Sequence, residues 1–128
     1  MRKLNVLMVD DNPQFLKAAR DMIAALPCVA VAECANSGAE ALAQIGRLKC
    51  DLVLTDLSMP EMSGFELIRK LRTGDDDAPP RVFAVTLHDS VEYRAAVLRS
   101  GAEGLISKRE FGMLAPQLIA SLSGTGSA

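Results

Sequence analysis

Residues 52–56 read Leu52-Val53-Leu54-Thr55-Asp56, a short apolar run that ends at a carboxylate. An apolar run without polar alternation indicates a strand buried on both faces, as in a parallel sheet covered by helices. A charge at the end of such a strand is costly unless something compensates it. Asp56 therefore indicates a functional site rather than a simple loop cap.

Three further apolar runs end in polar groups that fit the same site. Residues 6–9, 82–85 and 105–107 lead to Asp10-Asp11, Thr86 and Lys108. In an open α/β sheet, functional groups gather at the carboxyl ends of parallel strands. Taken singly, Asp10-Asp11 suits a turn, Thr86 a strand and Lys108 a solvated surface. In this order they favour a phosphoryl-transfer site with a cation, an acceptor, a charge neutraliser and a sensor.

Amphipathic segments alternate with these runs and predict five βα units in a three-layer α/β sandwich. The expected strands cover about residues 4–9, 29–35, 52–55, 82–85 and 104–107, and the expected helices about 13–26, 38–48, 65–72 and 90–99, with a fifth at the end. Asn12 and Ser37 are the predicted N-caps of the first two helices. Gly112 and Pro116 fall in the first half of the fifth helix and predict a late start or a kink.

The composition is that of one soluble globular domain. The chain has 128 residues, 49% of them hydrophobic and 23% charged, with a net charge of −2 and a pI near 5.4. This acidic balance argues against direct nucleic-acid binding. Cys28, Cys34 and Cys50 show no CxxC spacing, which favours a reducing compartment. With no signal peptide and no membrane span, we expect a cytoplasmic domain over residues 1–122, followed by a flexible tail, 123–128.

The chemistry of the candidate site follows from its charges. Asp10, Asp11 and Asp56 would repel one another and raise at least one pKa unless a cation lies among them. Oxygen ligands suit a hard divalent ion, and Mg²⁺ is the expected cofactor. Asp56 is the expected nucleophile, since a carboxylate can form an acyl phosphate. Lys108 would neutralise phosphoryl oxygens, and Thr86 would donate a hydrogen bond to the attached group.

These motifs resemble the receiver domain of a two-component response regulator. The resemblance spans about residues 3–122 and rests on Val9-Asp10-Asp11, Leu54-Thr55-Asp56-Leu57-Ser58-Met59-Pro60-Glu61-Met62-Ser63-Gly64, Val85-Thr86 and Lys108. It implies a flavodoxin-like fold with strand order 2-1-3-4-5. It also implies that a histidine kinase or phosphotransfer protein phosphorylates Asp56. The implied Mg²⁺ ligands are Asp11 and Asp56 directly, Asp10 through water, and the backbone carbonyl of Ser58.

The chain departs from the family pattern at three positions. Leu105 occupies the switch position, three residues before the lysine, where the family usually has an aromatic ring. Arg109 follows the lysine in place of the usual proline. Leu87 follows Thr86 where a small residue is common, and we predict that it restricts access to phosphorylated Asp56.

The segments around Thr86 and Lys108 are similar to receivers attached to LuxR-type DNA-binding output domains. Whether this chain acts alone or within a longer regulator stays open, as do the downstream target and a homodimer.

Two other functional classes share part of this pattern. Haloacid-dehalogenase enzymes also use a strand-end aspartate, but they need a second aspartate two residues later, where this chain has Ser58. A phosphorylation-independent interaction module on the same fold is the alternative that Leu105 leaves open. The run Asp75-Asp76-Asp77 is interpreted as a solvated loop, and the single histidine, His88, as an exposed loop residue. We therefore expect a phosphoacceptor switch rather than an enzyme.

Overall fold

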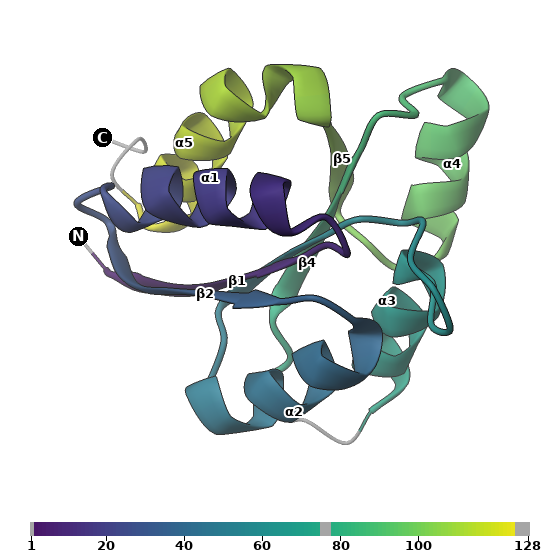
Figure 1. Ribbon diagram of the computed structural model, residues 1–128, viewed down its shortest axis with the longest axis horizontal. Helices are drawn as coiled ribbons and strands as arrows, with labels where there is room; N and C mark the ends of the chain where they lie inside the picture. Colours follow the sequence, from purple (N-terminus) through teal and green to yellow (C-terminus); the bar gives the residue numbers. More distant parts are fainter. Residues whose placement is uncertain (1, 75–77, 125–128) are drawn as a thin grey trace.

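The computed structural model describes residues 2–74 and 78–124, and a five-stranded parallel sheet of order β2-β1-β3-β4-β5 lies at its centre (Figure 1). The strands are β1 (Leu4–Val9), β2 (Val29–Ala35), β3 (Leu52–Thr55), β4 (Arg81–Thr86) and β5 (Gly104–Ser107). The helices are α1 (Pro13–Ala24), α2 (Gly38–Leu48), α3 (Gly64–Thr73), α4 (Val91–Arg99) and α5 (Phe111–Leu122), with a 3-10 turn, η1 (Lys108–Glu110), before α5. The predicted fold class and strand order are confirmed.

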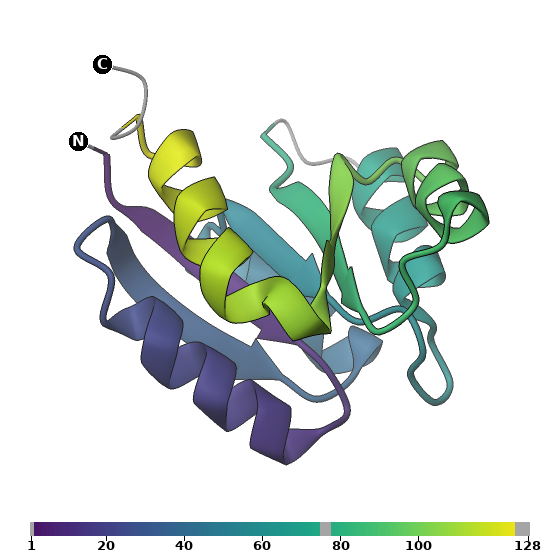
Figure 2. The same cartoon turned by 90° about the horizontal axis from the view of Figure 1, so that it is seen from above.

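The sheet separates two apolar cores, one on each face. Helices α1 and α5 pack on one face, and α2, α3 and α4 on the other (Figures 1 and 2). Neighbouring residues of β1 divide between them, since Met8 belongs to the first core and Leu7 to the second. Because successive side chains in a strand point to opposite faces, both must be apolar when both faces are covered. This explains the apolar runs in the sequence.

Side-chain caps begin the helices where the sequence predicts them. The Asn12 side chain accepts hydrogen bonds from the backbone N–H groups of Gln14 and Phe15, and Pro13 is the first residue of α1. The hydroxyl of Ser37 accepts a hydrogen bond from the Glu40 N–H at the start of α2. These contacts satisfy amides that have no partner within the helix. The cap of α1 also fixes the chain direction immediately after Asp10 and Asp11.

A late start or a kink was predicted for helix α5, and the late start is wrong, whereas the kink stays a prediction. It begins at Phe111, so Gly112 lies in its first turn and Pro116 lies inside the helix. The 3-10 turn η1 leads directly into it, and the Ser107 hydroxyl accepts a hydrogen bond from the Arg109 N–H at this junction. Sequence propensity missed this start because a short turn, rather than a good helix former, initiates α5.

Two predicted segments lie partly or wholly outside the described residues. Asp75-Asp76-Asp77 lies outside them, as do residues 125–128 of the expected tail. Ser123, the first residue of that tail, is buried at the end of α5, and its backbone carbonyl accepts a hydrogen bond from the Arg2 N–H.

Candidate functional site

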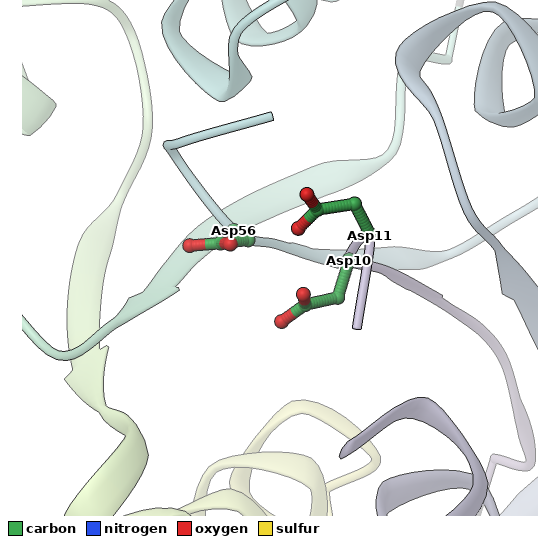
Figure 3. A group of neighbouring side chains, drawn as sticks. All are labelled: Asp10, Asp11 and Asp56. Atoms are coloured by element: carbon green, nitrogen blue, oxygen red, sulfur yellow. The ribbon is translucent and has the colours of Figure 1, made fainter. Parts of the chain in front are cut away.

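The three aspartates meet at the carboxyl ends of the neighbouring strands β1 and β3 (Figure 3). The backbone N–H of Asp56 donates to the Val9 carbonyl at 2.8 Å, which sets the end of β3 beside the end of β1. One carboxylate oxygen each from Asp10, Asp11 and Asp56 lies within 4.8 Å of the others. Asp10 and Asp56 are buried and Asp11 is exposed, so the cluster opens to solvent on one side.

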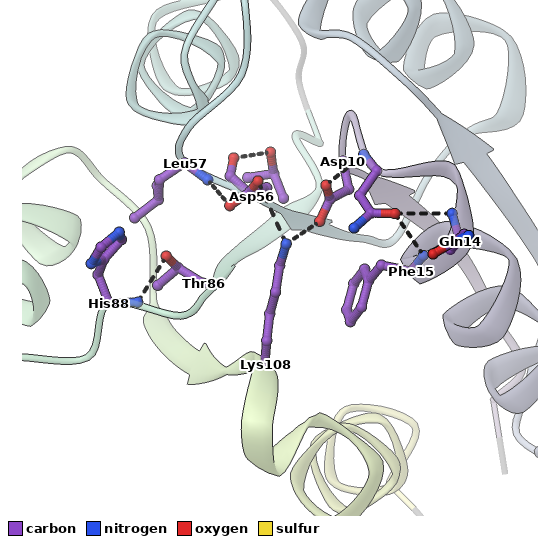
Figure 4. Close-up of polar contacts among 10 residues, drawn as sticks. Asp10, Gln14, Phe15, Asp56, Leu57, Thr86, His88 and Lys108 are labelled. Atoms are coloured by element: carbon purple, nitrogen blue, oxygen red, sulfur yellow. Dashed lines mark hydrogen bonds and ion pairs between the residues drawn. The ribbon is translucent and has the colours of Figure 1, made fainter.

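Lys108 brings the opposing charge from the end of β5. Its Nζ atom lies 2.6 Å from Asp10 Oδ2 and 3.6 Å from Asp56 Oδ2 (Figure 4). Only 15% of the lysine side chain is exposed, against 2% for Asp10 and 10% for Asp56. Charges this far from water interact more strongly than surface ion pairs. The lysine therefore joins both buried carboxylates across the end of the sheet.

The electrostatic balance of the site is negative. Burial raises the pKa of Asp56, and the neighbouring Asp10 carboxylate raises it further. The Lys108 ammonium and the backbone N–H groups of Leu57 and Ser58 oppose this rise without cancelling it. Three carboxylates around one ammonium thus carry an excess of negative charge, which a second cation would balance. The all-oxygen donor set fits a hard divalent ion such as Mg²⁺.

The loop after Asp56 is held tightly against the start of α3. Asp56 Oδ1 accepts a hydrogen bond of 2.8 Å from the Leu57 N–H, and the Leu57 carbonyl accepts one of 2.9 Å from the Gly64 N–H. A Cβ atom at Gly64 would clash with the Asp56 carbonyl oxygen and lie 2.7 Å from Leu57 Cα. Glycine at residue 64 is therefore required for this approach, which fixes the backbone that carries Asp56.

A small cavity of about 110 Å³ opens beside Asp56, and its lining residues are Asp56, Ser58, Thr86, Leu87, His88 and Lys108. Thr86 is buried, and its hydroxyl accepts a hydrogen bond of 3.2 Å from the His88 N–H. Leu87 lies at the rim with 53% of its surface exposed. The structure thus brings together the carboxylate of Asp56, the ammonium of Lys108 and the hydroxyl of Thr86 around a cavity that a ligand could enter.

The expected switch residue, Leu105, lies outside the cavity beside Asp56. It is half-buried, packs against the core on the α2–α3–α4 face, and does not line the cavity. Its backbone carbonyl accepts a hydrogen bond of 3.4 Å from Arg94 of α4.

Three aromatic contacts near the site were not predicted. The His88 ring stacks on Tyr93 with centroids 5.2 Å apart, and the Tyr93 ring lies 6.0 Å from that of Phe65 on α3. The Phe15 ring lies below the Lys108 ammonium, 4.7 Å from its centroid. The spacing of Phe15 from Asp10-Asp11 was the available signal, because the first turn of the following helix must begin beside those carboxylates.

Comparison with known proteins shows that the response regulator receiver domain family matches residues 6–116. The chain belongs to this family. The receiver is 32% identical over 103 residues to the nitrate/nitrite response regulator protein NarL of Escherichia coli K12, an alignment that covers 80% of this chain and 47% of NarL.

Solved receiver structures agree with this assignment. The signal receiver domain of NarL from Mycobacterium tuberculosis is 26% identical with a TM-score of 0.84, covering 96% of this chain and 98% of that one. The receiver domain of the histidine kinase CKI1 from Arabidopsis thaliana, complexed with Mg²⁺, is 28% identical with a TM-score of 0.78. The match covers 95% of this chain and 93% of that one.

This receiver spans less than half the length of the curated relatives that it matches. None of the helices within residues 2–74 and 78–124 is long and apolar enough to cross a bilayer.

Proposed function

We propose that this receiver is a phosphoacceptor signalling switch in which Asp56 takes a phosphoryl group from a phosphohistidine donor. The observation that supports it most is the position of Lys108, whose ammonium lies 3.6 Å from Asp56 Oδ2 beside a cavity also lined by Thr86. Acceptor, positive charge and hydroxyl then surround one space, as phosphoryl transfer needs.

In the proposed reaction, a carboxylate oxygen of Asp56 attacks phosphorus in line with the leaving imidazole. The new O–P bond forms as the P–N bond breaks, and the electron pair of that bond stays on the imidazole nitrogen. Lys108 neutralises charge on the phosphoryl oxygens during transfer and afterwards. Asp56 must be ionised to act, and the nearby ammonium favours that form against the effects of burial.

The acidic cluster is the proposed Mg²⁺ site. Asp11 and Asp56 would bind the ion directly, Asp10 through water, and the Ser58 backbone carbonyl would add another oxygen. The meeting of three carboxylate oxygens within 4.8 Å supports this assignment. When bound, Mg²⁺ would neutralise the crowded carboxylates and the incoming phosphoryl oxygens.

We further propose that the signal leaves the site through Thr86 and Leu105. A phosphoryl oxygen on Asp56 would accept a hydrogen bond from the Thr86 hydroxyl and draw that side chain toward the cavity, while the hydroxyl oxygen now accepts from the His88 N–H. The His88–Tyr93 stack then offers a path to α4 that Leu105, without a ring, does not provide by itself. The partner-binding surface would change through repacking of α4 and β5.

The proposed partners are a sensor histidine kinase or a phosphotransfer protein upstream, with a homodimer as one form of the output. The proposed receiver unit covers residues 1–122, with 123–128 as a tail. By itself, this unit would bind no nucleic acid and would catalyse no turnover of a separate substrate. Its three free cysteines fit a reducing compartment, and we propose the cytoplasm as its place of action.

Intact-mass measurement after incubation with acetyl phosphate and Mg²⁺ tests this function. We expect one phosphoryl group on the wild type, none on Asp56→Asn, and none when EDTA is present. Asp51→Asn is the matched control, because Asp51 lies at the opposite end of β3 and pairs with Arg2. Equal labelling of the wild type and Asp56→Asn would contradict the proposal.

A phosphorylation-independent interaction module is the second candidate, and the absence of a ring at Leu105 favours it. It predicts that Asp56→Asn binds the same partner with unchanged affinity, with or without acetyl phosphate. The switch predicts that phosphorylation changes this affinity in the wild type alone.

A further inference from the structure

Lys108 is held by more than its two ion pairs. A lysine side chain is a flexible four-carbon stem, and its ammonium has no preferred direction of its own. Here the Nζ atom lies 4.7 Å from the centroid of the Phe15 ring, while the two carboxylates face it from the sheet (Figure 4). This distance is within the range of a cation–π contact, in which the negative face of a ring attracts a cation.

The Phe15 ring is itself fixed in place. It meets the ring of Phe111 edge to face, with centroids 5.4 Å apart and planes at 68°. Phe111 is buried in the core and follows Lys108 by three residues, so one turn of chain carries both the ammonium and the support for the ring. On the other side, the Asn12 cap binds the Phe15 N–H at 3.2 Å. The face of the ring is thus fixed relative to Asp10.

We propose that Phe15 is a positioning residue for phosphorylation of Asp56, acting through Lys108; this inference rests on the proposed function. The carboxylate of Asp10 lies closer to the ammonium than that of Asp56 and, acting alone, would draw the lysine toward it. The ring face supplies a third attraction that keeps the ammonium near the gap between them. A leucine could fill the same space, but it has no negative face.

The experiment compares initial rates of phosphorylation by acetyl phosphate with Mg²⁺. Phe15→Leu should be slower by about three- to tenfold, and Phe15→Tyr, which keeps the ring, should restore the rate. Phe83→Leu is the matched control, because Phe83 packs against the same core and removal of its ring leaves Lys108 untouched.

Fluorinated phenylalanines at residue 15 separate attraction from packing. One, two or three ring fluorines weaken the negative face progressively with little change in shape, so the rate should fall in that order. An unchanged rate with trifluorophenylalanine, or a Phe83→Leu variant as slow as Phe15→Leu, would overturn the role of Phe15.

An NMR measurement keeps this test apart from that of the function. The Phe15 ring should shift the proton signals of the Lys108 side chain, and Phe15→Leu should abolish that shift in the unphosphorylated protein. If the ring-current shift is present but the wild type takes up no phosphoryl group, the proposed function fails while the contact stands. If the wild type is phosphorylated but the shift is absent, only the inference about Phe15 fails.

Discussion

Replacing Asp56 with asparagine should make the metal-free protein more stable at neutral pH. The substitution removes a negative charge from a cluster in which three carboxylate oxygens lie within 4.8 Å of one another. The side chain is only 10% exposed, so its charge has also lost most of its hydration. Both effects disfavour the ionised carboxylate in the folded protein, and asparagine removes both while keeping nearly the same shape.

The magnitude follows from the charges around Asp56. At an effective dielectric constant of about 20, repulsion by each of two carboxylates at 4.8 Å is about 3.5 kcal/mol. Attraction to the Lys108 ammonium at 3.6 Å is about 4.6 kcal/mol on the same scale. The difference is about 2 kcal/mol in favour of removing the charge. Screening around exposed Asp11 lowers this figure and lost hydration raises it, so we expect a gain of about 1–3 kcal/mol.

The pH dependence has a definite sign. Burial and Asp10 raise the pKa of Asp56 in the folded state above its value in the unfolded chain. Below the unfolded value, about 4, the carboxyl is protonated in both states and its charge contributes no difference. As the pH rises from the unfolded pKa to the folded pKa, the wild type loses stability because the unfolded chain gives up its proton first, and Asp56→Asn has no such loss. The advantage of the variant should therefore grow with pH and level off above the folded pKa.

Urea unfolding in EDTA, followed by circular dichroism across this pH range, measures the effect. Adding Mg²⁺ should shrink the difference, because an ion that binds the folded wild type stabilises it. Asp51→Asn should show no such gain, since Asp51 has a cationic partner in Arg2. An Asp56→Asn variant that is no more stable than the wild type at neutral pH without metal would refute this electrostatic reasoning.

Four further substitutions test the packing and charge of the protein. Lys108→Met should lower the free energy of unfolding by about 3 kcal/mol in urea titrations, because two buried carboxylates lose their cation; an unchanged midpoint would contradict the ion pairs. Gly64→Ala should destabilise the protein by more than about 2 kcal/mol, since the new methyl group meets backbone atoms. Gly46→Ala, in an open position of α2, should stabilise it by about 0.5–1 kcal/mol, and thermal melts that rank the two alike would count against this packing. Leu87→Ala should speed loss of the phosphoryl group from Asp56, measured by intact mass over time, because Leu87 lies at the rim of the cavity; an equal or slower loss would show that it does not restrict water.

The strands could be predicted closely because burial on both faces leaves an unbroken apolar run. The bounds of β1, β2, β3 and β5 agree with the expected ranges. The fourth strand is longer than expected at both ends, since Arg81 pairs with Leu52 and Thr86 with Ser107 through the backbone. Backbone pairing does not depend on an apolar side chain, so a search for apolar residues misses such ends.

The meeting of Asp10, Asp11, Asp56 and Lys108 was also predictable, because parallel strands deliver their ends to one edge of the sheet. The particular atoms that each of these side chains contacts could not be predicted. The ammonium lies 1 Å nearer to Asp10 than to Asp56, and that choice depends on side-chain rotamers. Phe15 of α1 packs against the first core, yet its ring also contacts Lys108. Helical spacing identifies the buried stripe but not which charged group lies over its first ring.

The most direct test of the central claim is to locate the phosphoryl group chemically. After incubation with acetyl phosphate and Mg²⁺, borohydride would reduce an aspartyl phosphate to homoserine, and peptide mass spectrometry would identify the altered residue. We predict homoserine at residue 56 in the wild type and no homoserine in Asp56→Asn. Homoserine at residue 10 or 11, or a phosphoryl group that resists reduction, would contradict the assignment of Asp56 as the phosphoacceptor.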